Sequence, residues 1–136
     1  MNEDILTSKN SERVFFIMTI GTSIIDMEHF KRLTAKPKFL ARYYSPQEMK
    51  FLMGKNFSVP IMAEMFAAKT AFVKALGINA HGVKLSDVSV LTDYSGTYYL
   101  SLTGRAKIIL VAKKYRTVVS CSHHKISAIA NVLLYD

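Results

Sequence analysis

The sequence contains a single cysteine, Cys121, and no apolar stretch long enough to cross a membrane. One cysteine excludes an internal disulfide and is typical of a reducing compartment, which predicts a cytoplasmic location. A membrane-spanning helix needs roughly 20 consecutive apolar residues, whereas the apolar residues here are spread along the chain. Residues 1–13 are polar and of mixed charge, so they lack the basic start and apolar centre of a secretory signal. We therefore expect a soluble protein without a membrane partner.

The chain also lacks the short motifs that mark several enzyme classes. It contains no Gly-rich phosphate-binding loop and no nucleophile elbow. Serine hydrolysis is disfavoured, because a catalytic serine needs a general base and an orienting acid, and no acidic partner stands out. His123 and His124 are neighbours at the end of an expected strand, so their side chains should point to opposite faces and make a poor metal site.

Positive charge is what the composition has in excess. Eighteen Lys and Arg residues against ten Asp and Glu residues leave a net charge of +8. Such a field attracts nucleic acids, acidic membranes, phosphorylated cofactors or acidic proteins. Nucleic acid is not the expected partner, because the aromatic residues fall mostly within apolar runs and form no basic and aromatic stacking platform.

The length and the apolar pattern predict one domain of mixed secondary structure. The 136 residues suffice for a single hydrophobic core, which we place at 14–136 after a flexible tail over 1–13. The pattern predicts a strand over 14–21, a helix over 25–33, a short helix capped by Ser45 and a long helix from Pro60 that ends at Gly77. A hairpin over 88–103, a helix over 105–114 and strands over 118–123 and 126–135 should follow. This order is typical of an α+β fold, with helices packed against a largely antiparallel sheet.

Two groups of polar residues are not explained by these elements. Lys69 lies within the apolar stripe of the long helix, so it must reach solvent along its stem or meet an anion. Thr70 and Lys74 are four residues apart on the same helix and share a face that could address one ligand, although such pairs are often only a solvated face. The segment 120–124 (SCSHH) turns a β-rich run polar, which a strand edge explains equally well.

Five segments in order carry a family resemblance: 20–26 (IGTSIID), 38–42 (KFLAR), 44–48 (YSPQE), 66–77 (FAAKTAFVKALG) and 122–123 (SH). Together they resemble the bacterial holo-acyl-carrier-protein synthases, which are small 4′-phosphopantetheinyl transferases of fatty-acid synthesis. Segment 66–77 is the most specific, because its Phe-Ala-Ala-Lys and Lys-Ala-Leu-Gly pieces have the family's spacing.

The resemblance implies a fold, an activity and an assembly. The fold would be that of the 4′-phosphopantetheinyl transferases, and three copies would form a homotrimer with coenzyme A in a cleft between protomers. The activity would move 4′-phosphopantetheine from coenzyme A to a serine of an acidic apo acyl carrier protein. In the family a magnesium ion bridges the pyrophosphate, a base takes the serine proton, and cations neutralise the leaving nucleotide.

The resemblance also implies roles for individual residues. Residues expected at coenzyme A are Lys69, Lys74, Gly77, Ser122 and His123. Residues expected to act in catalysis are Lys74, His123 and Asp26. The carrier protein would dock on a basic surface formed by His29, Lys31, Arg32, Lys36 and Lys38.

The positions of the family's magnesium ligands depart from the pattern. Ser23 replaces the family aspartate of the first strand, and Thr70 replaces the glutamate of the long helix. Met65 and His29 stand where the family has arginines, whereas Asp26 keeps the charge of a family glutamate. Magnesium prefers charged oxygen ligands, so we expect weak metal binding at Ser23 and Thr70.

Two hypotheses follow on the same fold. The chain is a transferase in which the substrate's own phosphates hold the metal and Asp26, Lys69, Lys74 and His123 supply the protein groups. Alternatively, it is a catalytically impaired or inactive relative that binds carrier protein or a coenzyme A-like ligand through its basic surface.

Overall fold

A computed structural model describes residues 18–136. Its main sheet has three antiparallel strands in the order β1 (Thr19–Asp26), β5 (Ser127–Tyr135) and β4 (Arg116–His123). The central strand β5 pairs Ala130 with Ser23 on one side and with Cys121 on the other. These three residues therefore form one row across the sheet, on the face that is buried.

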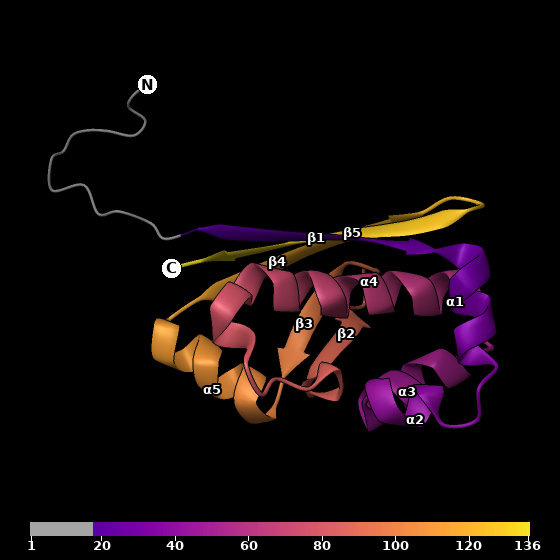
Figure 1. The fold of residues 1–136 in the computed structure, drawn as a ribbon, viewed down its shortest axis with the longest axis horizontal. Helices are drawn as coiled ribbons and strands as arrows, with labels where there is room; N and C mark the ends of the chain where they lie inside the picture. Colours follow the sequence, from indigo (N-terminus) through magenta and orange to yellow (C-terminus); the bar gives the residue numbers. More distant parts are fainter. Residues whose placement is uncertain (1–17) are drawn as a thin grey trace, which may run out of the picture.

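Helix α4 (Val59–Leu76) lies against this buried face and forms the centre of the molecule (Figure 1). Most of its side chains are buried, which agrees with the apolar stripe predicted from the sequence. Gly21 allows the close approach of β1, since a Cβ atom there would lie 1.9 Å from the carbonyl oxygen of Ala71. The helix ends at Gly77, whose positive φ of 60° is a value that glycine adopts without strain.

The remaining elements cover the other side of α4. A separate hairpin pairs β2 (Val88–Thr92) with β3 (Tyr98–Leu102), and α5 (Gly104–Lys113) follows it. Helices α1 (Met27–Thr34), α2 (Phe39–Tyr43) and α3 (Pro46–Met53) lie at the opposite end from α5 (Figure 1). Two short 3-10 helices, Gly77–Ala80 and Leu85–Asp87, complete the elements of residues 18–136. The mixed fold with antiparallel strands is confirmed, although the strands of the described part of the chain form two sheets and not one.

The boundaries of the first two elements differ from those predicted. The first strand was expected over 14–21, but β1 runs to Asp26 because Ile24 and Ile25 pair with β5. Helix α1 therefore begins only at Met27, and the Asp26 carboxylate caps it by accepting a hydrogen bond from the His29 amide at 2.8 Å. The predicted tail over 1–13 and the start of the predicted strand lie outside the described residues.

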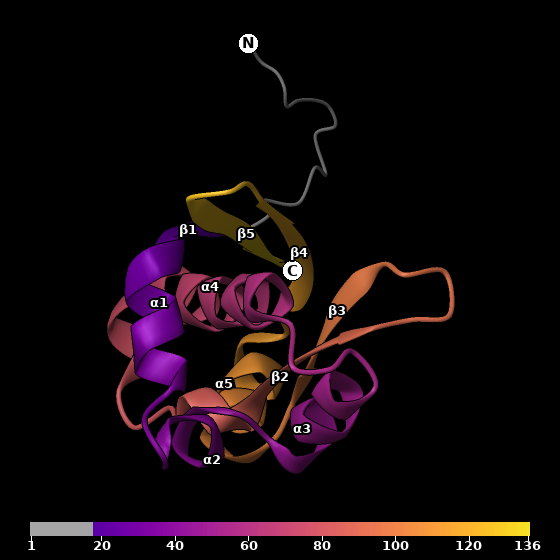
Figure 2. The same cartoon turned by 90° about the vertical axis from the view of Figure 1, so that its right-hand side faces the viewer.

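The second face of the main sheet carries exposed apolar side chains. Ile20, Ile24 and Val118 are 68%, 66% and 52% exposed. Figures 1 and 2 show α4 on one side of the sheet and no helix of residues 18–136 on the other. We call these three residues and their neighbours Ile129 and Leu133 the open sheet face. Within the same residues, no helix is long and apolar enough to span a bilayer.

Candidate functional site

Ser23 and Thr70, the expected metal positions, face each other between β1 and α4. Their hydroxyl oxygens lie 2.7 Å apart, and the Thr70 hydroxyl is also 3.1 Å from the carbonyl oxygens of Phe66 and Ala67. Ser23 is buried and Thr70 is partly buried. The structure thus brings the two positions together, but the hydroxyls bond to each other, and the Thr70 hydroxyl also contacts the helix backbone.

This pair of hydroxyls does not fit a magnesium ion. Magnesium is held in proteins mainly by carboxylates and water, and Ser23 and Thr70 bring no charge. Among residues 18–136, no three His, Cys, Asp or Glu side chains are grouped so that they could hold a metal. The Asp26 carboxylate is exposed and caps α1. Because side chains alternate along β1, Asp26 also points to the opposite face of the sheet from Ser23.

Lys74 lies beside the hydroxyl pair. Its exposed ammonium donates a hydrogen bond to the carbonyl oxygen of Thr22 at 3.0 Å. Gly77 follows one turn later at the exposed end of α4. Lys74 and the Ser23–Thr70 pair are therefore close to β1, at one edge of the main sheet.

Lys69 is placed differently from the expectation that it faces a cofactor phosphate. Its side chain is fully buried and forms an ion pair with Glu48 on α3 at 2.5 Å. The ammonium also donates to the carbonyl oxygens of Leu85 at 2.9 Å and Val88 at 2.6 Å. These three contacts use all three of its hydrogens, so Lys69 meets an anion supplied by its own chain.

Burial controls the ionisation of this pair. Loss of water raises the pKa of Glu48 and lowers the pKa of Lys69, and the attraction between the two charges opposes both changes. Glu48 also accepts hydrogen bonds from the backbone amides of Ser45 and Val90. The pair therefore joins α3, α4 and β2 and serves the fold.

His123 lies at the opposite edge of the main sheet, on β4. Its Nδ1 is 2.6 Å from Oε2 of Glu64 on α4, and the other oxygen of Glu64 accepts a hydrogen bond from the Tyr98 hydroxyl at 2.7 Å. The His123 side chain is 41% exposed, whereas that of Glu64 is only 10% exposed. We call His123, Glu64 and Tyr98 the histidine cluster.

Sequence reasoning missed Glu64 and Tyr98. One signal was available, because Glu64 is a charged residue within an otherwise apolar helix, as Lys69 is. Burial raises the pKa of the Tyr98 phenol, and its hydrogen bond to Glu64 raises it further. Burial also raises the pKa of the nearby Cys121 thiol to about 12, with the Glu64 carboxylate adding to the effect.

Ser122 and Asp26 are not brought to these groups. Side chains alternate along β4, so Ser122 points to the other face of the sheet from His123 and is exposed. Asp26 lines a separate groove of about 430 Å³ together with Lys31 and Lys125. The expected site residues therefore fall into groups that a single chain does not assemble.

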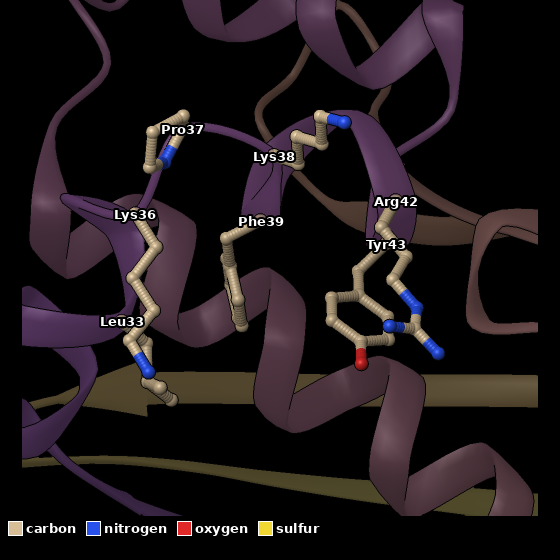
Figure 3. Close-up of a pocket in the computed structure, with 7 residues that line it drawn as sticks. All are labelled: Leu33, Lys36, Pro37, Lys38, Phe39, Arg42 and Tyr43. Atoms are coloured by element: carbon tan, nitrogen blue, oxygen red, sulfur yellow. The ribbon is translucent and has the colours of Figure 1, made fainter.

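A second groove, of about 540 Å³, contains part of the expected docking surface. It is lined by Leu33, Lys36, Pro37, Lys38, Phe39, Arg42 and Tyr43. Figure 3 shows the rings of Phe39 and Tyr43 side by side between Lys36 and Arg42. Arg42 was not among the expected docking residues, and its guanidinium lies 5.4 Å from the Tyr43 ring centroid. We call this the basic groove.

Comparisons with known proteins agree on one family. Residues 23–127 match the family model described as ACPS, the 4′-phosphopantetheinyl transferase superfamily. A holo-[acyl-carrier-protein] synthase from Treponema denticola is 32% identical over 120 residues, which cover 87% of this chain and 98% of that protein.

Solved structures give the same result. The complex of the Chronobacterium ammoniagenes ACPS with CoA superposes with a TM-score of 0.77 at 26% identity, covering 87% of this chain and 96% of that one. The holo-(acyl-carrier-protein) synthase of Bacillus anthracis, in complex with CoA (3′,5′-ADP), gives a TM-score of 0.74 at 26% identity, with 90% and 99% covered.

Proposed function

Because this chain belongs to the 4′-phosphopantetheinyl transferase superfamily, we propose that it transfers 4′-phosphopantetheine from coenzyme A to a serine of an acidic acyl carrier protein in the cytoplasm. The observation that carries the proposal is that the chain matches nearly the full length of a holo-[acyl-carrier-protein] synthase. The accessible ammonium of Lys74 supports it, since the transfer displaces an anionic nucleotide.

The site would lie between two copies of the chain. Lys74 and the Ser23–Thr70 pair lie at the β1 edge of the main sheet, and His123 lies at the β4 edge with β5 between them. A head-to-tail contact that closes into a ring would place the first edge of one copy against the second edge of the next. The open sheet face supports this assembly, because its exposed apolar side chains lie together on one face, on both sides of a polar row that contains Asn131. Grouped apolar side chains that face water mark an interaction site. A homotrimer of this kind is the assembly that we propose.

In this site, the negative charge of the coenzyme A phosphates would be neutralised mainly by side chains of the protein and less by a metal ion. Lys74 is positioned to approach a phosphate once its contact with the Thr22 carbonyl is exchanged. Lys69 would contribute only through the fold, because its ammonium is buried against Glu48.

The carrier protein would dock at the basic groove and the exposed side of α1. Lys36 and Arg42 flank an apolar floor of Phe39 and Tyr43, which suits an acidic helix that carries apolar residues. Lys31 and Arg32 extend the positive surface along α1, and the exposed His29 lies on the same helix.

One observation favours a second candidate function. The Ser23–Thr70 hydroxyl pair occupies the place where a metal would be held, and it leaves that place without charge. The chain would then bind coenzyme A or carrier protein without transfer.

A mass-shift assay separates the two functions. Purified apo carrier protein is incubated with coenzyme A and the chain, once with magnesium and once with a chelator. If the chain is a transferase, the mass of the carrier protein should increase by one phosphopantetheine group. Binding of carrier protein or of coenzyme A, measured by calorimetry without any mass increase, supports the second candidate. The absence of transfer and of both binding events refutes the two candidates together.

Carrier docking is tested by charge reversal. Lys36→Glu and Arg42→Glu should weaken carrier binding and reduce its dependence on salt. Lys113→Glu is the matched control, because Lys113 is exposed on α5 at the other end of the molecule (Figure 1). Equal binding by all three variants would contradict this docking site.

A further inference from the structure

The histidine cluster has the arrangement of a general base held by a carboxylate. We propose that His123 removes the proton from the attacking carrier serine and that Glu64 is the positioning residue that sets the imidazole for this task. The proposal rests on the proposed transferase function. It adds a base, and a reason for its orientation, to a site that holds no carboxylate at Ser23 or Thr70.

The contact between His123 and Glu64 fixes which ring nitrogen is available. An ionised carboxylate only accepts hydrogen bonds, so the 2.6 Å contact requires the proton of the neutral imidazole to be on Nδ1. The lone pair is then on Nε2. Within residues 18–136, Nε2 makes no hydrogen bond, and the side chain is 41% exposed. An incoming hydroxyl can therefore reach it.

Tyr98 holds the carboxylate from the other side. Its hydroxyl donates to Oε1 at 2.7 Å while His123 occupies Oε2, so each oxygen of Glu64 has a partner. The three residues of the cluster come from three elements, β3, α4 and β4. A nearly buried carboxylate fixed at both oxygens holds an imidazole in one orientation, which is the function of the acid in a carboxylate–histidine pair.

The other candidate bases are engaged or uncharged. Ser23 and Thr70 are neutral hydroxyls that contact each other. Asp26 caps α1, and Lys69 is buried in its ion pair. His123 combines an accessible nitrogen with a partner that stabilises the positive charge it gains.

The chemical step balances with the groups named. The serine O–H proton moves to Nε2 while the serine oxygen forms a bond to the phosphorus that carries pantetheine. The bond from this phosphorus to the bridging oxygen breaks, and 3′,5′-ADP leaves with the electron pair. Glu64 stabilises the imidazolium, which then releases its proton to solvent.

The test uses the full chain and measures both the tautomer of His123 and the kinetics of the transfer. Long-range ¹H–¹⁵N spectra of the neutral ring should show the proton of His123 on Nδ1 in the wild type and on Nε2 in Glu64→Ala. Glu64→Ala should lower kcat about 100-fold, within the range for general base catalysis, with little change in the KM for coenzyme A. Glu64→Gln, whose amide oxygen still accepts from Nδ1, should keep the tautomer and lose less activity.

Two further variants are controls. Tyr98→Phe removes only the hydrogen bond from the Tyr98 hydroxyl to Glu64 and should have a smaller effect on kcat than Glu64→Ala. Asp136→Asn removes one exposed carboxylate outside the cluster and should leave both readings unchanged.

Three results would overturn the proposal. These are a wild-type proton on Nε2, an unchanged kcat in folded Glu64→Ala, or a loss that appears only in KM, which would assign His123 to phosphate binding. If the wild type is active and the Glu64 variants are equally active, this proposal alone is refuted. A wild type that transfers nothing refutes the proposed function as well.

Discussion

Two residues, Ser23 and Thr70, determine what the β1–α4 contact can bind. Because their hydroxyls satisfy each other at 2.7 Å, the place needs no ion for its stability. A carboxylate at either position would be left with unpaired charge in a partly buried place and would attract a cation.

Restoring the carboxylates should therefore create metal binding. We expect the double variant Ser23→Asp/Thr70→Glu to bind Mg²⁺ or Mn²⁺ more tightly than the wild type, because two charged oxygen ligands replace neutral ones. Isothermal titration calorimetry with the metal alone measures this, and Ser23→Asn/Thr70→Gln is the uncharged control of similar size. Equal affinity in the wild type and the carboxylate variant would show that the place is not a latent metal site.

Cys121 provides a prediction about pH. Burial, followed by the Glu64 charge, raises the pKa of its thiol from 9.0 to about 12. In the unfolded chain the thiol has its ordinary pKa of 9.0, so the folded state holds the thiol proton more tightly. The contribution of this pKa difference to the free energy of unfolding is complete below pH 9.0 and is lost as the pH rises toward 12. At pH 9.0, iodoacetamide should alkylate the folded protein far more slowly than the urea-unfolded protein. Equal rates would contradict the raised pKa.

The sequence predicted these residues unequally, for physical reasons. Lys69 could be recognised as anomalous because a charge within an apolar stripe needs a partner. Its partner Glu48 was read only as the end of a capping box, which it also is, since its Oε1 accepts from the Ser45 amide. The two residues are distant in sequence, and nothing local indicates that they meet.

At the scale of elements, the Glu48–Lys69 pair ties α3 to α4 and, through Val88 and Val90, to β2. Removing one partner leaves an uncompensated charge in a fully buried place. We expect Glu48→Gln to lower the free energy of unfolding by about 3–5 kcal/mol, measured by urea denaturation. The control Lys50→Gln, exposed on the same helix, should change it by at most about 0.5 kcal/mol.

A double variant checks the origin of this loss. Glu48→Met/Lys69→Met removes both charges, so it should cost less than the sum of the two single changes. Additive losses would show that the residues stabilise the fold independently of each other.

Element boundaries were predictable where the signal was local. Ser45, Pro46 and Glu48 set the start of α3, and Pro60 and Gly77 set the extent of α4 to within one residue at its start. The end of β1 was missed because residues 25–33 have a rough helical period, whereas pairing with β5, over 100 residues later, keeps Ile25 and Asp26 extended. Long-range pairing overrode the local pattern there.

At the scale of the whole molecule, the open sheet face should hold the copies together. Ile24→Glu places a charge on this face and should convert the assembly to a 15.3 kDa monomer. Ile108→Glu is the matched control, since Ile108 is 64% exposed on α5. Light scattering after size-exclusion chromatography measures the mass. A monomeric wild type, or equal masses for both variants, would contradict an interface on this face.

The fold and family were predictable from five short segments, and the comparisons confirm both. The arrangement of the site was not, because it depends on which sheet edge each residue reaches. Ser122 and His123 are consecutive in sequence but point to opposite faces, whereas Glu64 and His123 are 59 residues apart and in contact. Only the packing of α4 on the sheet establishes that contact.

The separation of Lys74 and His123 onto opposite edges of the main sheet has a genetic consequence for the assembly proposed above. A Lys74→Ala chain keeps an intact His123 edge, and a His123→Gln chain keeps an intact Lys74 edge. Each pure variant would carry one damaged half in every site. Mixed assemblies would join two undamaged halves at some boundaries, so two inactive alleles expressed together should complement each other.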